Sequence, residues 1–287
     1  MSTIAIGNFD GLHLGHQFLL MKMKAIAELE NRKPIAYTFV PNTHEKKRLT
    51  SDIQKVKFIK NLGVKSIVLQ DFSKEFAALN SDEFINLVLL KQLGATHIIV
   101  GSNFKFGANG FGNAGTLANK KKIKTTIVEP IFAGSSICSS SAVRCAVEFG
   151  NLNLVKQLLG RPYSLSGNVI EGRKRGRLLG YPTANLKIEQ EVIPPLGVYA
   201  IHDNCMRFGI ANIGRRPTFE INNDICIEIY FLNFNTNLYK SRIEIFLDLF
   251  VRKEMTFASA DKLKIQILND IKTVEKFYSK TNQPSLL

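Results

Sequence analysis

The sequence contains no tryptophan and only four cysteines, which are Cys138, Cys145, Cys205 and Cys226. The cysteines are scattered and form no Cys-x-x-Cys pair, so neither a disulfide framework nor a zinc site is expected, and a reducing compartment suits them. No apolar run is long enough to span a membrane, and the first residues lack the basic flank and apolar stretch of a secretion signal. We therefore expect a cytoplasmic protein without a membrane partner.

Acidic residues are also scarce, since 24 Asp and Glu stand against 38 Lys and Arg, which gives a net charge of +14. This excess favours an anionic partner such as nucleic acid, anionic lipid or nucleotide phosphates, and the charge alone does not choose among them. The densest basic run, Lys120 to Lys124, is more typical of a solvated loop or strand edge than of an RNA site. At 287 residues the chain exceeds the usual size of one domain, so two domains are predicted.

The first 160 residues alternate short apolar runs with amphipathic stretches, which is typical of β-α units on a parallel sheet. The predicted strands are residues 4–6, 35–40, 66–69, 97–100 and 125–128, and the predicted helices are residues 15–30, 52–62, 81–93 and 140–149. Gly63 and Gly94 stand where helix C-caps are expected, just before the next strand. The sequence therefore predicts an N-terminal α/β domain of Rossmann-like type over residues 1–160.

The second part of the chain has a different sequence pattern, because apolar runs follow one another without predicted helices between them. The predicted strands are residues 167–170, 197–202, 208–212, 224–232 and 241–249. This pattern predicts an antiparallel β-barrel over residues 161–287, with a linker near residues 150–164. A helix with an apolar face is expected at the C-terminus, with Ser259 as its N-cap.

The segment Gly7-Asn-Phe-Asp-Gly-Leu-His-Leu-Gly-His16 directly follows the first strand and opens a helix, where an open α/β sheet presents its ligand crevice. Its glycines let the backbone approach an anion closely, and free helix N–H groups would point at that anion. His13 and His16 are three residues apart, so on a helix they face the same side. These features suit the binding of a nucleoside triphosphate. A Gly-rich turn with two capping histidines and no ligand would have the same sequence pattern.

A second anion cradle is predicted at Ser139-Ser-Ser-Ala-Val-Arg144, where hydroxyl groups start another helix and an arginine follows about one turn later. Taken alone, this segment would be an ordinary serine N-cap. If the two segments act together, they suit transfer of a nucleotidyl group. That reaction needs chiefly positioning, positive charge at the α-phosphate and Mg²⁺.

The segment Gly7 to His16 resembles the first block of the nucleotidyltransferase module in the bacterial bifunctional riboflavin kinase/FAD synthetase family. Residues 38–41, 62–64, 100–107 and 139–144 are similar to the later blocks of that module, in the same order. The resemblance implies that ATP is bound by Gly7, Asn8, Phe9, Asp10, Gly11, His13, Gly15, His16, Ser139, Ser140, Ser141 and Arg144. It implies catalytic roles for His13, His16 and Arg144, and flavin binding near Pro41, Asn103 and Phe106. Pro41-Asn-Thr replaces the Pro-His-Pro of the family, and Ser141 replaces a threonine.

The segment Gly167 to Asn185 carries four glycines and four basic residues between its first glycine and Gly180, directly after a predicted strand. A phosphate cradle is one use of such a loop, and a basic surface hairpin is the other. Thr183 and Asn185 offer neutral oxygens two residues apart. Such oxygens suit a hard cation that keeps water and nucleotide phosphates as its other ligands.

The whole segment is similar to the flavokinase signature Gly-x-Val-x-x-Gly-x-x-x-Gly-Arg-x-Leu-Gly-x-Pro-Thr-Ala-Asn, and residues 212–219 and 251–254 resemble its downstream blocks. The resemblance implies ATP binding by Gly172, Arg177, Gly180, Pro182, Thr183 and Asn185, with Thr183 and Asn185 also holding the metal ion. It implies flavin binding by Arg252 and Glu254, and Glu228 as the base for the ribityl hydroxyl. Without it, Glu228 would be a solvated residue on the polar face of an apolar strand. Tyr230 stands where the family often has histidine.

The resemblance implies two ATP-dependent reactions, with Mg²⁺ as cofactor. Riboflavin would be phosphorylated to FMN in the C-terminal domain, and FMN would be adenylylated to FAD with release of pyrophosphate in the N-terminal domain. One alternative is a riboflavin kinase with a weakened or differently specific nucleotidyltransferase domain. Another is a basic nucleic-acid-binding regulator, against which the retained polar residues of both motifs argue. We expect small-molecule partners, no nucleic acid and a monomer.

Overall fold

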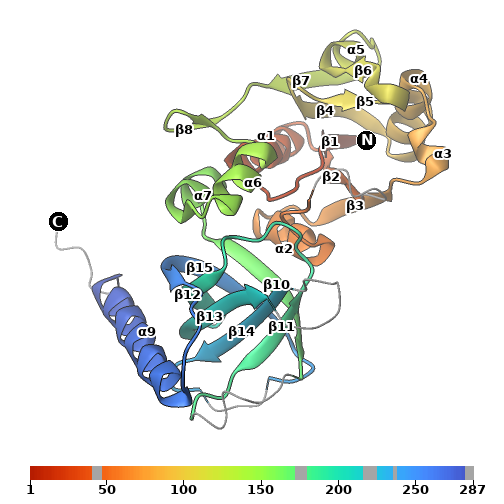
Figure 1. Ribbon diagram of the computed structural model, residues 1–287. Coiled ribbons are helices and arrows are strands. Elements are labelled where there is room, and N and C mark those ends of the chain that lie inside the picture. The colour runs from red at the N-terminus through yellow and green to blue at the C-terminus, as the bar shows by residue number, and fades with distance from the viewer. Residues whose placement is uncertain (41–46, 172–179, 216–224, 235–237, 282–287) are drawn as a thin grey trace. The chain divides into compact units, whose positions relative to one another are not determined.

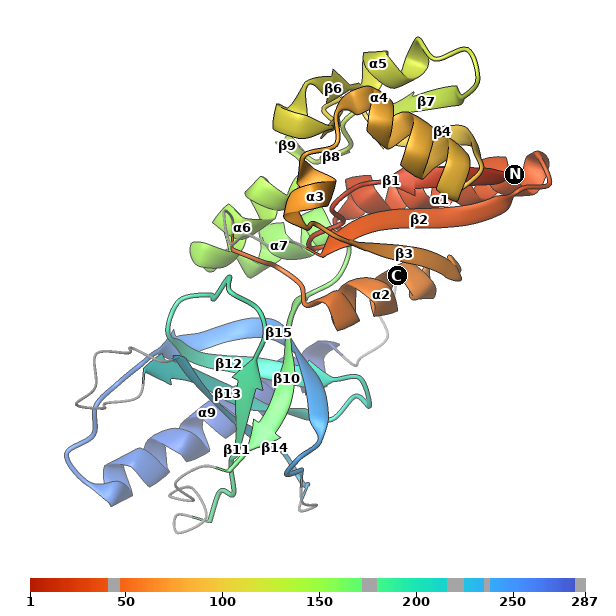
Figure 2. The ribbon, with the colours of Figure 1, turned by 90° about the vertical axis from the view of Figure 1, so that its right-hand side faces the viewer.

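The computed structural model describes residues 1–40, 47–171, 180–215, 225–234 and 238–281. The chain divides into two compact units, which Figures 1 and 2 draw. The first comprises Met1–Arg144 with Gln157–Gly160, and the second comprises Cys145–Lys156 with the chain from Arg161 onward. No helix in the described ranges is both long and apolar enough to cross a membrane.

The first unit is built on a five-stranded sheet in the order β3-β2-β1-β4-β7, in which all neighbours are parallel. Its strands are β1 (Ser2–Ile6), β2 (Lys33–Val40), β3 (Ser66–Asp71), β4 (Ala95–Gly101) and β7 (Lys124–Val128). The predicted parallel sheet is therefore confirmed. The chain runs outward from β1 to β3 and then returns to β4 on the other side of β1. This reversal makes a topological switch point, where open α/β sheets bind ligands.

Helices cover both faces of this sheet, and Figure 2 shows α2 and α4 on opposite sides of it. The helical elements within the first unit are α1 (Leu14–Leu29), α2 (Asp52–Asn61), α3 (Lys74–Ala77), α4 (Ser81–Glu83), η1 (Phe84–Gln92), η2 (Ala108–Gly110) and α5 (Ala114–Ala118). Two further helices, α6 (Ser140–Glu148) and α7 (Leu152–Leu159), are divided between the units, since residues 145–156 belong to the second. Side chains of β1 alternate between two cores. Ile4 and Ile6 pack with Leu89 of η1, whereas Ala5 packs with Leu20 of α1.

The sequence prediction needs three corrections in this region. The helix expected at residues 81–93 is a short α4 followed by the π-helical η1, a change that no local signal in the sequence marks. The linker expected near residues 150–164 contains α7, because the side chain of Asn151 accepts a hydrogen bond from Leu154 N and Val155 and Leu158 are buried. Two short hairpins were not predicted, β5 (Lys105–Phe106) with β6 (Gly112–Asn113) and β8 (Phe132–Ala133) with β9 (Ser136–Ile137).

The second unit contains a closed antiparallel barrel in the order β10-β11-β14-β13-β12-β15, as predicted. Its strands are β10 (Tyr163–Ile170), β11 (Ala184–Ile188), β12 (Gly197–Asp203), β13 (Phe208–Arg215), β14 (Ile225–Phe231) and β15 (Arg242–Lys253). β11 was not predicted, and β10 starts four residues before its predicted start at Gly167.

The C-terminal helix α9 (Ala260–Thr281) lies against the outside of the barrel, as Figure 1 shows. The predicted N-cap is confirmed, because the Ser259 hydroxyl accepts a hydrogen bond from Lys262 N at 3.3 Å. Val274 and Tyr278 of α9 pack with Ala200 of β12 in a small apolar cluster. The helix is therefore held to the barrel by its apolar face.

We predict that Gly167→Ala destabilises the barrel. A Cβ atom at Gly167 of β10 would overlap the carbonyl oxygen of Lys187 on β11, and backbone cannot move aside as a flexible side chain can. The expected loss in the free energy of unfolding is about 2 kcal/mol or more, as for other forced overpacking. Urea unfolding followed by circular dichroism measures this loss. Asn168→Ala, at an exposed neighbour, is the control, and equal stability of the two variants would contradict the prediction.

Candidate functional site

A cavity of about 760 Å³ lies in the first unit, at the carboxyl ends of β1 and β4. Its wall is formed by the turn between β1 and α1, the segment after β4, residues 128–131 and the start of α6. Many residues expected to bind ATP or flavin line it, namely Gly7, Asn8, Phe9, Asp10, His13, Gly15, His16, Asn103, Phe106, Ser139, Ser140, Ser141 and Arg144. The structure therefore brings the two predicted anion cradles and two predicted flavin residues around one space. Pro41 lies outside the described residues.

The turn between β1 and α1 has an unusual backbone. Phe9 and Leu12 have φ angles of 48° and 42°, in the left-handed region that non-glycine residues seldom adopt, and Gly11 between them has 78°. Each such non-glycine residue costs on the order of 1 to 3 kcal/mol, so the surrounding structure must hold it. Both side chains are buried, and a Cβ at Gly7 would come within 2.9 Å of the Phe9 ring. Burial of Phe9 thus shapes the turn and requires glycine at position 7.

The two histidines of the turn lie together, as predicted. His13 is the N-cap of α1, and its Nδ1 accepts a hydrogen bond from His16 N at 3.4 Å. The two rings stack with their centroids 3.6 Å apart, and the rings of Phe9 and His16 meet edge to face. Burial lowers the pKa of His16 well below its usual value, and the neighbouring His13 and Lys55 lower it further. At neutral pH His16 is therefore an uncharged imidazole that offers one N–H donor.

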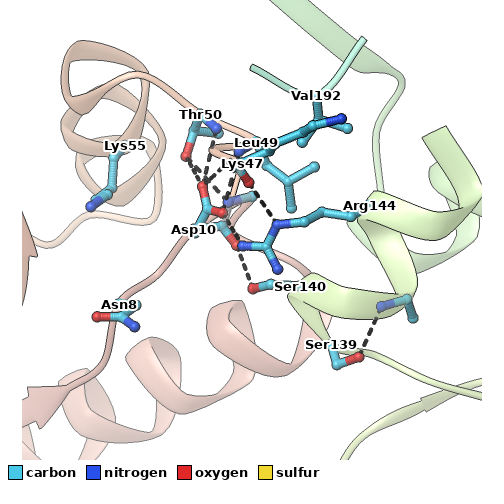
Figure 3. A network of polar contacts seen from close by, with 12 residues as sticks. Asn8, Asp10, Lys47, Leu49, Thr50, Lys55, Ser139, Ser140, Arg144 and Val192 are labelled. Carbon is cyan, nitrogen blue, oxygen red and sulfur yellow. Dashed lines mark hydrogen bonds and ion pairs between the residues drawn. The ribbon is translucent and has the colours of Figure 1, made fainter. Parts of the chain in front are cut away.

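Asp10 makes a dense set of contacts with the protein, drawn in Figure 3. Its Oδ1 accepts hydrogen bonds from Leu49 N at 3.0 Å and from both N and Oγ1 of Thr50 at 3.1 Å. Its Oδ2 pairs with Arg144 Nη2 at 2.6 Å, and its backbone oxygen accepts from Ser140 Oγ at 2.9 Å. Asp10 therefore joins the turn, the segment before α2 and the start of α6. Because these contacts all go to the protein, Asp10 holds the three segments together.

At the start of α6, some residues make hydrogen bonds within the protein and others are exposed to the cavity. Ser139 is the predicted N-cap, since its hydroxyl accepts a hydrogen bond from Ala142 N at 3.1 Å. Arg144 also donates from Nε to Lys47 O at 2.7 Å, and 18% of its side chain is exposed. Ser141 is exposed and lines the cavity. A helix start, one exposed hydroxyl and a partly exposed guanidinium therefore face the space.

The other side of the cavity is an aromatic wall that sequence reasoning mostly missed. Phe104 and Phe106 stack with centroids 5.6 Å apart and planes at 15°, and Phe106 also packs on Phe84. The remaining lining phenylalanines of this wall are Phe39, Phe72 and Phe76. Predicted Phe106 is 7% exposed, whereas predicted Asn103 is exposed beside it. The only sequence signal was a count of 20 Phe with no Trp, which does not show that these rings meet.

In the barrel, strand register brings two predicted polar residues, Asn185 and Glu228, into one row with Asn212. Asn185 of β11 pairs with Glu228 of β14, and Glu228 pairs with Asn212 of β13. Directly paired residues point to the same face of a sheet, so the three side chains lie side by side. Glu228 is exposed while Ile227 and Ile229 are buried, which confirms the predicted alternation.

The residues around this row have the following places. Asn185 is buried, and its Oδ1 accepts a hydrogen bond from the Cys226 thiol at 3.3 Å. Thr183 is partly buried two residues before it, and Pro182 is exposed. Tyr230 meets the Tyr181 ring edge to face at 5.5 Å, and burial raises the pKa of Tyr230. Gly180 has φ 86°, and the predicted Gly172 and Arg177 fall outside the described ranges.

The two predicted flavin residues of the barrel follow in β15 and just after it. Arg252 donates from Nε and Nη2 to the carboxylate of Asp270 on α9, a contact that the sequence did not predict. Glu254 is exposed, and its carboxylate lies beside Gly214, where a Cβ would overlap it. Arg252 therefore faces α9, and Glu254 lies next to β13.

Comparison with known proteins places the chain in one family. A family model described as FAD synthetase matches residues 1–142, and one described as riboflavin kinase matches residues 159–278. A bifunctional riboflavin kinase/FMN adenylyltransferase of Buchnera aphidicola subsp. Schizaphis graminum is 36% identical over 97% of this chain and 94% of that protein. The chain belongs to this family. The protein of that name from Escherichia coli K12 is 34% identical over 97% of the chain and 93% of its own length.

A solved structure from Streptococcus pneumoniae has a fold similar to that of this chain. That structure, titled a macrolide-efflux protein, is 27% identical and superposes with a TM-score of 0.83. The match covers 96% of this chain and 94% of the pneumococcal one. The likeness thus includes both the parallel sheet and the barrel.

The lowered pKa of His16 predicts how pH affects the first unit. The unfolded chain binds a proton at His16 near the usual pKa of 6.5, whereas the folded protein binds it only at lower pH. Stability from this residue is therefore full above about pH 6.5 and is lost as pH falls below it. The free energy of unfolding of the parent and of His16→Gln, measured at pH 7.5 and 5.5, tests this prediction. It should fall more between the two pH values in the parent than in the variant. Titration of the His16 ring near 6.5 by NMR would contradict the assignment.

Proposed function

We propose that the protein phosphorylates riboflavin at the barrel and adenylylates the FMN so formed at the cavity of the first unit. Both reactions use ATP, and the products are FMN with ADP, then FAD with pyrophosphate. The observation that carries this proposal is the pair of separate polar sites, each within one unit. We assign adenylyl transfer to residues 1–160 and the kinase to residues 161–287, in line with the family models. We further expect a cytoplasmic monomer.

Adenylyl transfer requires a phosphate oxygen of FMN to attack the α-phosphorus of ATP while the bond to pyrophosphate breaks. The start of α1, with His13 and His16, supplies backbone and imidazole N–H donors to the charge that develops on the phosphate. Arg144 and Ser141 supply further donors from the start of α6. The phenylalanine wall gives the flat isoalloxazine ring a surface for stacking. One cavity thus has a polar side for the phosphates and an aromatic side for the flavin.

In the kinase reaction, the ribityl 5'-hydroxyl attacks the γ-phosphorus of ATP and ADP leaves. Glu228 is exposed on β14 beside Asn185, and it accepts the hydroxyl proton as the new P–O bond forms. The oxygens of Thr183 and Asn185 fit a Mg²⁺ ion, because Mg²⁺ takes oxygen ligands and keeps water and substrate phosphates in its shell. When bound there, Mg²⁺ would neutralise charge on the transferring phosphate. The register of β11 with β14 pairs Asn185 with Glu228, which supports this proposal for the metal donor and the base.

We predict that Glu228→Gln abolishes most kinase activity and spares adenylyl transfer. The amide keeps the size of the side chain and can still hydrogen-bond to the ribityl hydroxyl, but it cannot accept the proton. Riboflavin phosphorylation should fall by about 10² to 10⁴, as for the loss of a general base. Conversion of riboflavin to FMN and of added FMN to FAD, each resolved by chromatography, measures both reactions in one preparation.

His16→Ala is the matched control for this experiment, because it changes only the other site. It should lower FAD formation by about two orders of magnitude or more, comparable to loss of a preorganised donor, and leave FMN formation unchanged. Equal loss of both products in either variant would show unfolding or a wrong assignment. Phosphorylation by Glu228→Gln within a few-fold of the parent would mean that the base lies elsewhere.

A further inference from the structure

Arg252, on the last barrel strand, is held by a buried acid that no sequence motif marks. Asp270 in the middle of α9 accepts hydrogen bonds from Arg252 Nε at 2.9 and 3.0 Å and from Nη2 at 2.8 Å. The exposed fraction is 3% for the Asp270 side chain and 18% for that of Arg252. Gln266, one turn earlier on α9, donates to Asp270 Oδ1 at 2.9 Å. The hydrogen bond from Gln266 thus helps to fix the orientation of the Asp270 carboxylate, independently of Arg252.

Strand register connects Arg252 to the proposed base. Glu228 pairs with Asn212, Asn212 pairs with Val198, and Val198 pairs with Arg252. Paired residues share a face, so Glu228 and Arg252 belong to one row on the outer wall of the barrel. With neighbouring strands about 4.8 Å apart, the row spans about 14 Å around the wall. An extended molecule with a three-ring system and a five-carbon chain can reach from one end of this row to the other.

The ion pair leaves Arg252 able to bind a ligand. Its contacts with Asp270, together with donation from Nη1 to Lys253 O at 3.0 Å, use three of the five N–H bonds of the guanidinium within the described chain. The other two can donate to carbonyl oxygens of an aromatic ring system. The Phe257 ring lies 5.7 Å from the guanidinium carbon. Asp270 therefore fixes the plane of the guanidinium without using all of its donors.

We propose that Asp270 is a positioning residue for riboflavin in the kinase site, acting through Arg252, so that α9 is part of that site. This proposal rests on the proposed function. A long arginine side chain that is free in solution loses rotamer freedom when a ligand orders it, and an arginine that is already ordered loses less. The ion pair therefore lowers the cost of binding the flavin. The hydrogen bonds of the pair named above join Arg252, Asp270, Lys253 and Gln266, and none of these is a residue that we assign to ATP or to the metal ion.

The competing explanation is that Asp270 only fastens α9 to the barrel. Removing one partner of a buried pair leaves an uncompensated charge and destabilises the fold. Tyr278→Phe separates the two explanations. It removes the hydrogen bond from Tyr278 to Asp248 at 2.6 Å, which also fastens α9 to β15, and leaves Arg252 and Asp270 unchanged.

The test compares Asp270→Asn, Asp270→Glu and Tyr278→Phe in the full chain. We expect Asp270→Asn to raise the KM for riboflavin about tenfold, the size of effect given by disordering one long side chain. The KM for ATP and kcat should stay close to the parent values, and Asp270→Glu should restore part of the flavin affinity. Tyr278→Phe should lower the melting temperature without changing the KM for riboflavin. Quenching of riboflavin fluorescence gives the same comparison by direct binding.

Two results would overturn the proposal. One is an unchanged riboflavin affinity in Asp270→Asn, and the other is a change that Tyr278→Phe reproduces at equal loss of melting temperature. Failure of the proposed function would look different, since the parent protein would then bind riboflavin without phosphorylating it. In that case the fluorescence titration still decides whether Asp270 sets flavin affinity.

Discussion

The carboxylate of Asp10 connects three segments that lie far apart in the sequence, and the phosphate-binding side of the first site depends on that connection. It holds the turn after β1 against Thr50 and against Arg144 of α6. The turn contains Phe9 and Leu12 in left-handed conformations, which persist only where neighbouring contacts hold them. By holding this turn, the Asp10 contacts keep the start of α1 and the start of α6 around the same cavity. The start of α1 places both histidines, because His13 is its N-cap and His16 lies in its first turn.

In the barrel, strand register instead of a polar network brings residues from distant segments together. Asn185, Glu228 and Asn212 are brought together because their strands pair residue by residue, and a slip of one position would turn Glu228 inward. Closure of the barrel fixes this register from both sides. The outer wall can then carry exposed polar groups while Ile227 and Ile229 fill the interior. Helix α9 adds a contact, Asp270 with Arg252, that register cannot supply.

The sequence predicted those features that have a local pattern. The parallel sheet followed from alternating apolar runs, the place of Glu228 from the alternation along its strand, and the paired histidines from their spacing. Features that depend on distant segments were missed. The phenylalanine wall combines rings from β2, the region around α3 and the segment after β4, and any of them could have been core residues. Asp270 was missed because the sequence alone does not show that Arg252 lies beside it. Without that partner, an acid on the polar face of a helix is expected to be exposed to solvent.

The central claim is that one chain carries two sites that act in series on a flavin. Incubation of the full-length protein with riboflavin, ATP and Mg²⁺, with samples taken over time and resolved by chromatography, tests it most directly. The account predicts that FMN appears first and FAD follows, and that added FMN yields FAD and pyrophosphate without riboflavin. Riboflavin that stays unchanged would contradict the account, as would FMN that accumulates while added FMN is never adenylylated.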